Sequence, residues 1–213
     1  MRFDNKKVLV TGASRGIGRA VARQFASAGA QVAVHCRANQ EAARDTLASL
    51  EGKGHVLCTG DLADAPTVQR IVTEVITSLG GLDILVNNAG IFEAHPIDEV
   101  SFAKWQTAWQ RTLAVNLTGP ANLCWCAVEH MREHGGGRIV NVSSRGAFRG
   151  EPRCPAYGAS KAGLNAMTQS LAQHVAGLGI FVGAVAPGFV ETDMAKTVLQ
   201  GPDGDDIRHQ SPL

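Results

Sequence analysis

The chain has 213 residues, of which 45% are hydrophobic and 18% charged, and a formal net charge of +1 at pH 7. These values fit a single domain over residues 1–213 and give no reason to expect a nucleic acid or a membrane as partner. No apolar run approaches membrane-spanning length, and no signal peptide is evident. The five cysteines lack zinc-ligand or CxxC spacing, so we expect free thiols, no metal site and a cytoplasmic protein.

Apolar, β-rich segments alternate with helical segments along the chain. The predicted strands are Lys7–Gly12, Ala30–Cys36, His55–Gly60, Asp83–Asn88, Arg138–Ser144 and Ile180–Ala186. Clear helical patterns cover Gly16–Ala28, Ala65–Leu79 and Pro155–Ala176. Most of the strands are apolar throughout, which is typical of strands covered on both faces. The alternation therefore predicts an α/β fold with a doubly wound parallel sheet.

The first predicted strand leads into a glycine-rich turn, TGASRGIG at Thr11–Gly18, with glycines at positions 12, 16 and 18. A strand that ends in such a turn and opens a helix directs backbone N–H groups and the positive helix end at a pyrophosphate. Glycine lets the backbone approach the ligand and lets the helix lie close to the strand. An ordinary glycine-rich turn is the alternative, but the position after the first strand favours dinucleotide binding.

Six motifs follow one another at mutually consistent spacings. They are TGASRGIG, NNAG (Asn87–Gly90), VNLTG (Val115–Gly119), VNVSS (Val140–Ser144), YGASK (Tyr157–Lys161) and PGFVETDM (Pro187–Met194). Together they resemble the short-chain dehydrogenase/reductase family over essentially the whole chain, most closely its 3-oxoacyl-[acyl-carrier-protein] reductases. The resemblance implies Rossmann-type topology with strand order 3-2-1-4-5-6. Members of the family usually continue through a further helix and a seventh strand, so we expect the biological chain to extend beyond Leu213.

The chain contains a single tyrosine, Tyr157, four residues before Lys161. Pro155 suits the first turn of a helix, which puts Tyr157 in that turn and Lys161 one turn later on the same face. A free phenol has a pKa of about 10, which is too high for acid–base chemistry near neutrality. We expect the lysine charge, the positive helix end and an oxidised nicotinamide together to lower the pKa of Tyr157 into a working range.

The resemblance implies roles for the catalytic residues. Tyr157 would donate a proton to the substrate carbonyl oxygen, while Ser144 hydrogen-bonds that oxygen as charge develops. Lys161 would also bind the nicotinamide ribose. Asn116 matches the family asparagine that holds a water linking Lys161 to solvent. Ser143 is expected to be structural, although the assignment between the two adjacent serines stays open by one residue.

The end of the second predicted strand indicates the choice of cofactor. An acidic residue there would bind the ribose hydroxyls of NAD and repel a 2′-phosphate. Cys36 and Arg37 occupy this position instead, and Arg15 lies in the glycine-rich turn. Either arginine alone is consistent with a surface residue, but two guanidinium groups suit bidentate phosphate recognition and favour NADP(H) over NAD(H).

The resemblance implies a larger cofactor-binding set across the motifs. It comprises Gly12, Ser14, Arg15, Gly16, Ile17, Gly18, Arg37, Asp61, Leu62, Asn88, Ala89, Gly90, Tyr157, Lys161, Pro187, Gly188, Val190 and Thr192. Asp61 is expected to contact the adenine, and capping of the next helix is its alternative role.

Five residues near the expected mouth of the site are candidates for substrate contacts: Arg145, Arg149, Arg153, Phe148 and Phe189. The arginines would attract an anionic substrate or a carrier thioester. A solvated loop is the favoured interpretation because Glu151 lies among them. The phenylalanines either line an apolar pocket or pack.

The sequence thus predicts an NADP(H)-dependent oxidoreductase that acts on a carbonyl or secondary alcohol, with a 3-oxoacyl thioester or a similar ketone as candidate substrate. The alternative is a catalytically silent dinucleotide-binding sensor or assembly subunit of the same fold. A small molecule is the expected substrate, and a homodimer or homotetramer is the expected assembly. The intact set Asn116, Ser144, Tyr157 and Lys161 favours the enzyme.

Overall fold

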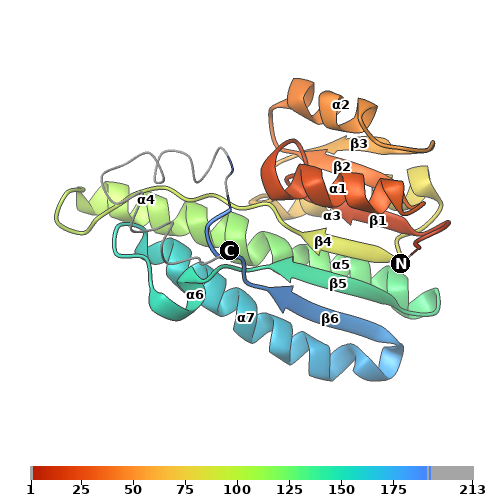
Figure 1. Cartoon of the computed structure of the whole chain (residues 1–213). Helices are drawn as coiled ribbons and strands as arrows, with labels where there is room; N and C mark the ends of the chain where they lie inside the picture. The colour runs from red at the N-terminus through yellow and green to blue at the C-terminus, as the bar shows by residue number, and fades with distance from the viewer. Residues whose placement is uncertain (1, 191, 193–213) are drawn as a thin grey trace.

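A computed structural model describes residues 2–190 and residue 192. These residues form one parallel sheet of six strands in the order β3-β2-β1-β4-β5-β6, as Figure 1 shows. The strands are β1 (Lys7–Val10), β2 (Gln31–Cys36), β3 (Val56–Thr59), β4 (Ile84–Asn87), β5 (Gly137–Val142) and β6 (Ile180–Val185). The predicted α/β class and strand order are therefore confirmed. Several strands end one or two residues before the prediction because their last polar residues turn into the loops that form the site.

Helices connect the strands. They are α1 (Gly16–Ser27), α2 (Gln40–Ala48), α3 (Ala65–Leu79), α4 (Phe102–Leu113), α5 (Gly119–Glu133), α6 (Gly146–Arg149) and α7 (Pro155–Val175). A π-helical turn, η1 (Ala114–Thr118), joins α4 to α5, and a 3-10 turn, η2 (Ala176–Leu178), follows α7. The three predicted helices agree with α1, α3 and α7 to within one residue. Pro155 stands in the first turn of α7, as expected.

The sheet is apolar on both faces because helices cover both. One core cluster joins the sheet to α3, α5 and α7 and includes Ile71, Leu123 and Val175. The other joins it to α1 and α2 and is built largely from alanines and valines, among them Ala22 and Ala43. Their small side chains let these helices approach the strands closely.

Parallel pairing places the carboxyl ends of all six strands at one edge of the sheet. β1 lies between β2 and β4, so the chain leaves β1 toward one side and returns as β4 on the other. Ligands of doubly wound sheets bind at such a switch point. Within residues 2–190 and 192, no helix has the length and apolarity to cross a membrane. The same residues contain no cluster of His, Cys, Asp and Glu suited to a metal ion.

Candidate active site

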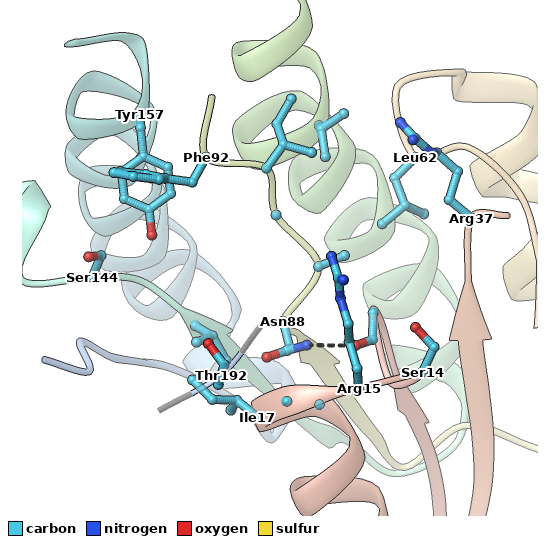
Figure 2. Close-up of a pocket in the computed structure, with 18 of the residues that line it drawn as sticks. Ser14, Arg15, Ile17, Arg37, Leu62, Asn88, Phe92, Ser144, Tyr157 and Thr192 are labelled. Atoms are coloured by element: carbon cyan, nitrogen blue, oxygen red, sulfur yellow. Dashed lines mark hydrogen bonds between the residues drawn. The ribbon is translucent and has the colours of Figure 1, made fainter. Parts of the chain in front are cut away.

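A cavity of about 460 Å³ opens at the carboxyl edge of the sheet, a size typical of small-molecule sites (Figure 2). All eighteen residues of the predicted cofactor set lie on its wall. Ser144, Tyr157 and Lys161 lie on the wall as well, whereas Asn116 is fully buried behind it. In Figure 2, Ser144 and Tyr157 occupy one side of the cavity, and Arg15 and Arg37 occupy the other.

The glycine-rich turn forms the floor of the cavity near α1. Gly12 and Gly16 have φ of 64° and 53°, in the left-handed region that disfavours other residues. A Cβ on Gly18 would collide with the carbonyl oxygen of Gly12 and with the Asn88 amide. The N-cap residue of α1, Arg15, makes no side-chain cap hydrogen bond. A glycine-rich backbone at the start of a helix lets a ligand come close to its N–H groups, which suits a pyrophosphate.

Thr11 and Asn88 join this turn to the loop after β4. The Thr11 hydroxyl accepts hydrogen bonds from the backbone N–H groups of Asn88 (2.9 Å) and Ala89 (3.0 Å). The Asn88 side-chain amide donates to the carbonyl oxygens of Thr11 (2.8 Å) and Gly12 (3.2 Å). These bonds fix the two loops of the switch point relative to each other.

His35, which the sequence analysis missed, holds the same turn from β2. Its Nδ1 accepts a hydrogen bond from Gly12 N–H at 3.3 Å, and its Nε2 donates to the Gly60 carbonyl oxygen at 3.1 Å. The side chain is 1% exposed, and burial lowers its pKa to about 4. The ring is therefore neutral and links the glycine-rich turn to the loop after β3. A histidine inside an otherwise apolar strand was the available signal.

Asp61 lies at the adenine end of the predicted site and forms an ion pair with Arg111 at 2.7 Å. Burial pushes the pKa of Asp61 upward, but the hydrogen bonds from Arg111 and Ala63 N–H outweigh burial and hold it below its usual value. The alternative role of Asp61 as a helix cap is wrong, because Asp64 caps α3 by accepting from Thr67 N–H. No motif or spacing in the sequence pointed to Arg111.

Lys161 is 4% exposed, and its Nζ donates to the Val142 carbonyl oxygen at 2.8 Å. Burial lowers the pKa of Lys161 to about 8. Its Nζ lies 5.8 Å from the centroid of the Tyr157 ring, one helical turn away on the same face of α7.

The predicted lowering of the Tyr157 pKa is wrong for the groups of the chain itself. Burial raises the pKa of the phenol, a hydrogen bond with Ser144 lowers it in part, and the nearby Glu151 charge raises it again. The expectation weighed charges but not the loss of water around the ring. The phenol is therefore held in its protonated form.

Ser144 and Ser143 have different surroundings. Ser144 Oγ is hydrogen-bonded to Tyr157 and accepts from Gly146 N–H at 3.1 Å. Ser143 is 4% exposed, and its hydroxyl donates to the Lys161 carbonyl oxygen at 3.4 Å. This geometry favours Ser144 as the serine that faces a substrate oxygen.

Asn116 lies in the π-helical turn η1, a feature often found at functional sites. Its Oδ1 accepts from Ile91 N–H at 2.8 Å, and its Nδ2 donates to the Ile91 carbonyl oxygen at 2.9 Å and to Ser160 Oγ at 3.2 Å. The Asn116 amide thus joins the loop after β4 to α7.

Of the five candidate substrate contacts, some line the cavity and others lie outside it. Phe189 lies on the cavity wall with Arg145 stacked over its ring at 4.2 Å. Phe148 is 77% exposed and lies outside the cavity wall, so neither of the two alternatives, lining a pocket or packing, describes it. Arg153 forms a bidentate ion pair with Glu99, at 2.8 and 2.9 Å, which favours the solvated-loop interpretation for this arginine.

Two further residues on the cavity wall were not among the predicted site residues. Phe92, in the loop after β4, packs edge-to-face on Tyr157 with ring centroids 4.8 Å apart. Glu151 is half-buried on the wall, and burial raises its pKa. Neither residue lies in one of the six motifs. Glu191, Asp193 and Met194 of the last motif and the segment beyond it lie outside the described residues.

The family profile described as short chain dehydrogenase matches residues 6–203. The chain belongs to the short-chain dehydrogenase/reductase family. It is therefore an NAD(P)-dependent oxidoreductase, and the resemblance drawn from the six motifs is confirmed.

Relatives named for different activities match this short-chain dehydrogenase at similar levels of sequence identity. D-threitol dehydrogenase of Mycolicibacterium smegmatis is 37% identical over 99% of this chain and 80% of its own length. The 3-oxoacyl-[acyl-carrier-protein] reductase FabG of Staphylococcus aureus is 37% identical over 96% of this chain and 80% of its own length. A short-chain dehydrogenase of Burkholderia cenocepacia, solved in complex with NADP, aligns with a TM-score of 0.87 at 37% identity, covering 100% of this chain and 85% of that one.

Proposed function

We propose that this short-chain dehydrogenase is an NADP(H)-dependent enzyme that interconverts a ketone and a secondary alcohol with Tyr157 as proton donor and acceptor. The observation that carries the proposal is that Tyr157, Ser144 and the glycine-rich turn line one cavity from two sides, with Lys161 beside Tyr157.

The glycine-rich turn and the start of α1 would hold the pyrophosphate of the cofactor, and Lys161 and the Asn88–Gly90 segment would hold its riboses. The residues that would contact the nicotinamide are Pro187, Gly188, Val190 and Thr192. Bound NADPH would supply a hydride for the carbonyl carbon. The residues of the chain would stabilise the carbonyl oxygen and donate the proton.

Tyr157 would donate its phenolic proton to the substrate oxygen as negative charge develops there. Burial keeps the phenol protonated before the reaction, which suits a proton donor. Ser144, already hydrogen-bonded to Tyr157, would stabilise the same oxygen. The buried Lys161 charge would then stabilise the Tyr157 phenolate. A proton would return to this phenolate by way of Lys161 and Asn116.

Arg15 and Arg37 support the preference for NADP(H). Both lie on the cavity wall, on the side away from Tyr157, and β2 ends in Cys36 rather than in an acidic residue. A 2′-phosphate there would meet two guanidinium groups. The relative from Burkholderia cenocepacia was solved with NADP, which agrees with this preference.

We place the substrate among small ketones and 3-oxoacyl thioesters. Phe92 and Phe189 give the substrate side of the cavity apolar walls, while Glu151 gives it one carboxylate. The relatives include both a D-threitol dehydrogenase and a 3-oxoacyl-[acyl-carrier-protein] reductase. Glu151 would favour neutral hydroxyketones, and the neighbouring Arg145 would favour anionic thioesters.

The test is the rate of NADPH consumption with a short 3-oxoacyl thioester and with a four-carbon hydroxyketone, each run beside NADH. We expect turnover with at least one of them and a higher kcat/KM with NADPH. If NADPH binds but no ketone in an extended panel is reduced, the silent dinucleotide-binding alternative replaces the enzyme. If NADH is preferred, the role of the two arginines is wrong.

We propose in addition that copies of the chain associate as a homodimer or homotetramer and that the protein works in the cytoplasm. Exposed apolar side chains support association: Ile97 is 77% exposed, Phe102 73% and Trp125 60%. The five free cysteines suit a reducing compartment. Light scattering after size-exclusion chromatography would give the mass, and a monomer would contradict the first proposal.

A further inference from the structure

His95 is a buried histidine that none of the six motifs contains. Its side chain lies in the loop after β4, is 2% exposed, and packs edge-on against Trp105 of α4 with ring centroids 5.6 Å apart. Its Nδ1 lies 2.8 Å from the Glu93 carbonyl oxygen, and its Nε2 lies 3.2 Å from the backbone nitrogen of Ala156. Both ring nitrogens are thus engaged with backbone groups.

These partners fix the tautomer of the ring. The Glu93 carbonyl can only accept, so Nδ1 carries the proton and donates it. The Ala156 N–H can only donate, so Nε2 accepts. Each ring nitrogen is therefore matched to a backbone group, one at Glu93, two residues before His95, and one at Ala156, 61 residues after it.

Ala156 precedes Tyr157 and lies in the first turn of α7, where backbone N–H groups have no partner within the helix. The N-cap residue of α7, Cys154, makes no side-chain cap hydrogen bond. His95 supplies from another loop the acceptor that a serine or aspartate cap would ordinarily supply. The first turn of α7, which carries Tyr157, is therefore capped by a side chain from the loop after β4.

The loop from Ile91 to His95 contacts the first turns of α7 at two further places. Phe92 packs edge-to-face on the Tyr157 ring, with centroids 4.8 Å apart. The Asn116 amide binds both backbone groups of Ile91 and also Ser160 Oγ, whose hydroxyl donates to the Tyr157 carbonyl oxygen at 2.7 Å.

A backbone hydrogen bond also joins His95 to the segment that precedes α7. His95 N–H donates to the Arg153 carbonyl oxygen at 2.8 Å. Pro96 follows His95 and disfavours a helical backbone at His95, which suits this extended pairing. The loop is thus bonded to the chain on both sides of the α7 start.

We infer that His95 is a positioning residue for the reaction proposed above: it fixes the start of α7, and with it the Tyr157 phenol, by accepting the Ala156 N–H. This inference rests on the proposed function of Tyr157. His95 itself touches neither substrate nor cofactor. Its loss would displace the phenol from the reacting oxygen without altering the glycine-rich turn.

The test compares His95→Leu, which fills the space but has no acceptor, with His95→Gln, whose amide carries both an acceptor and a donor. We expect His95→Leu to lower kcat by about tenfold or more, since small misplacements of reacting groups have large effects on rate. The Kd for NADPH should stay within about twofold, because a Kd ratio of two is below 0.5 kcal/mol and indicates an intact cofactor site. His95→Gln should recover most of kcat.

His55 offers a matched control. It also bridges backbone groups, accepting from Val32 N–H at 3.1 Å and donating to the Glu51 carbonyl oxygen at 2.9 Å. It lies just before β3, at the amino edge of the sheet and away from the cavity. His55→Leu removes the same kind of bridge, so any loss of Tm that both leucine variants share is structural.

Because Tyr157 is the only tyrosine, 13Cζ-tyrosine labelling gives a single NMR resonance that reports on the phenol without any turnover. We expect His95→Leu to shift this resonance or split it, and His55→Leu to leave it unchanged. An unchanged resonance and an unchanged kcat in His95→Leu would overturn the inference, whatever happens to Tm. If no ketone is reduced by the wild-type chain, the proposed function fails, while the resonance still decides whether His95 positions Tyr157.

Discussion

The two sides of the cavity are built differently. The cofactor side uses backbone groups of the turn after β1, held by His35 from the neighbouring strand. The other side uses the side chains of Ser144, Tyr157 and Lys161, and the helix that carries two of them is capped by His95 from a distant loop. A backbone site tolerates changes of side chain but not of glycine, whereas a side-chain site depends on single functional groups. We therefore expect changes on the first side to alter binding and changes on the second to alter chemistry.

Ser144→Ala should give the largest effect among the following variants. Loss of one hydrogen-bond donor to a developing oxyanion lowers kcat by about 10²–10³-fold, and NADPH affinity should not change. Steady-state kinetics and a fluorescence titration with NADPH measure the two quantities. Ser143→Ala is the matched control, since this neighbour donates only a long hydrogen bond to the Lys161 carbonyl oxygen. If Ser143→Ala is the more damaging variant, the two serines have been assigned the wrong way round.

The histidine of the cofactor side predicts a dependence of stability on pH. The pKa of His35 is about 4 in the folded chain against 6.5 for the free side chain, so the unfolded chain binds the proton first as pH falls. The contribution of His35 is complete above pH 6.5 and is lost progressively down to pH 4, by about 3 kcal/mol in all.

Urea unfolding of the wild-type chain and of His35→Asn, at several pH values between 7 and 4, tests this dependence. Asparagine keeps an acceptor for Gly12 N–H but does not titrate in this range. The difference in unfolding free energy between the two proteins should shrink as pH falls. A difference that stays constant over this range would mean that His35 is not held neutral by burial.

Arg37→Ala should give the smallest effect of these variants, and it should change the binding of NADPH but not that of NADH. Removing a charge-assisted contact to a 2′-phosphate should raise the Kd for NADPH about tenfold and leave that for NADH unchanged. Arg44→Ala is the control, because Arg44 lies nearby on α2 but outside the cavity wall, with its guanidinium bonded to Gln40. Equal losses for the two cofactors would remove Arg37 from phosphate recognition.

The features that the sequence predicted correctly are those carried by local pattern. The glycine-rich turn and the Tyr157–Lys161 spacing follow from short motifs, and the order of the strands follows from the family resemblance that the six motifs carry. His35, Arg111 and His95 were missed because their partners lie 23, 50 and 61 residues away.

The effect of the chain's own groups on the Tyr157 pKa was also predicted in the wrong direction, because desolvation depends on packing that spacing does not reveal. The sequence left open whether Phe148 lines a pocket or packs, and the structure shows that it does neither. A four-residue helix, α6, directs this side chain toward solvent, whereas Phe189 in the loop after β6 lies on the cavity wall.

The account depends most on the phenol of Tyr157, which is proposed to donate the proton of the reaction beside the dinucleotide site. Tyr157→Phe tests this role most directly. NADPH affinity and ketone reduction are measured on the same preparation of the variant. The account predicts that the Kd for NADPH stays within about twofold while turnover falls by about 10²–10⁴-fold, the usual contribution of general acid catalysis. A phenylalanine variant that still reduces the ketone at a rate near that of the wild-type chain would contradict it.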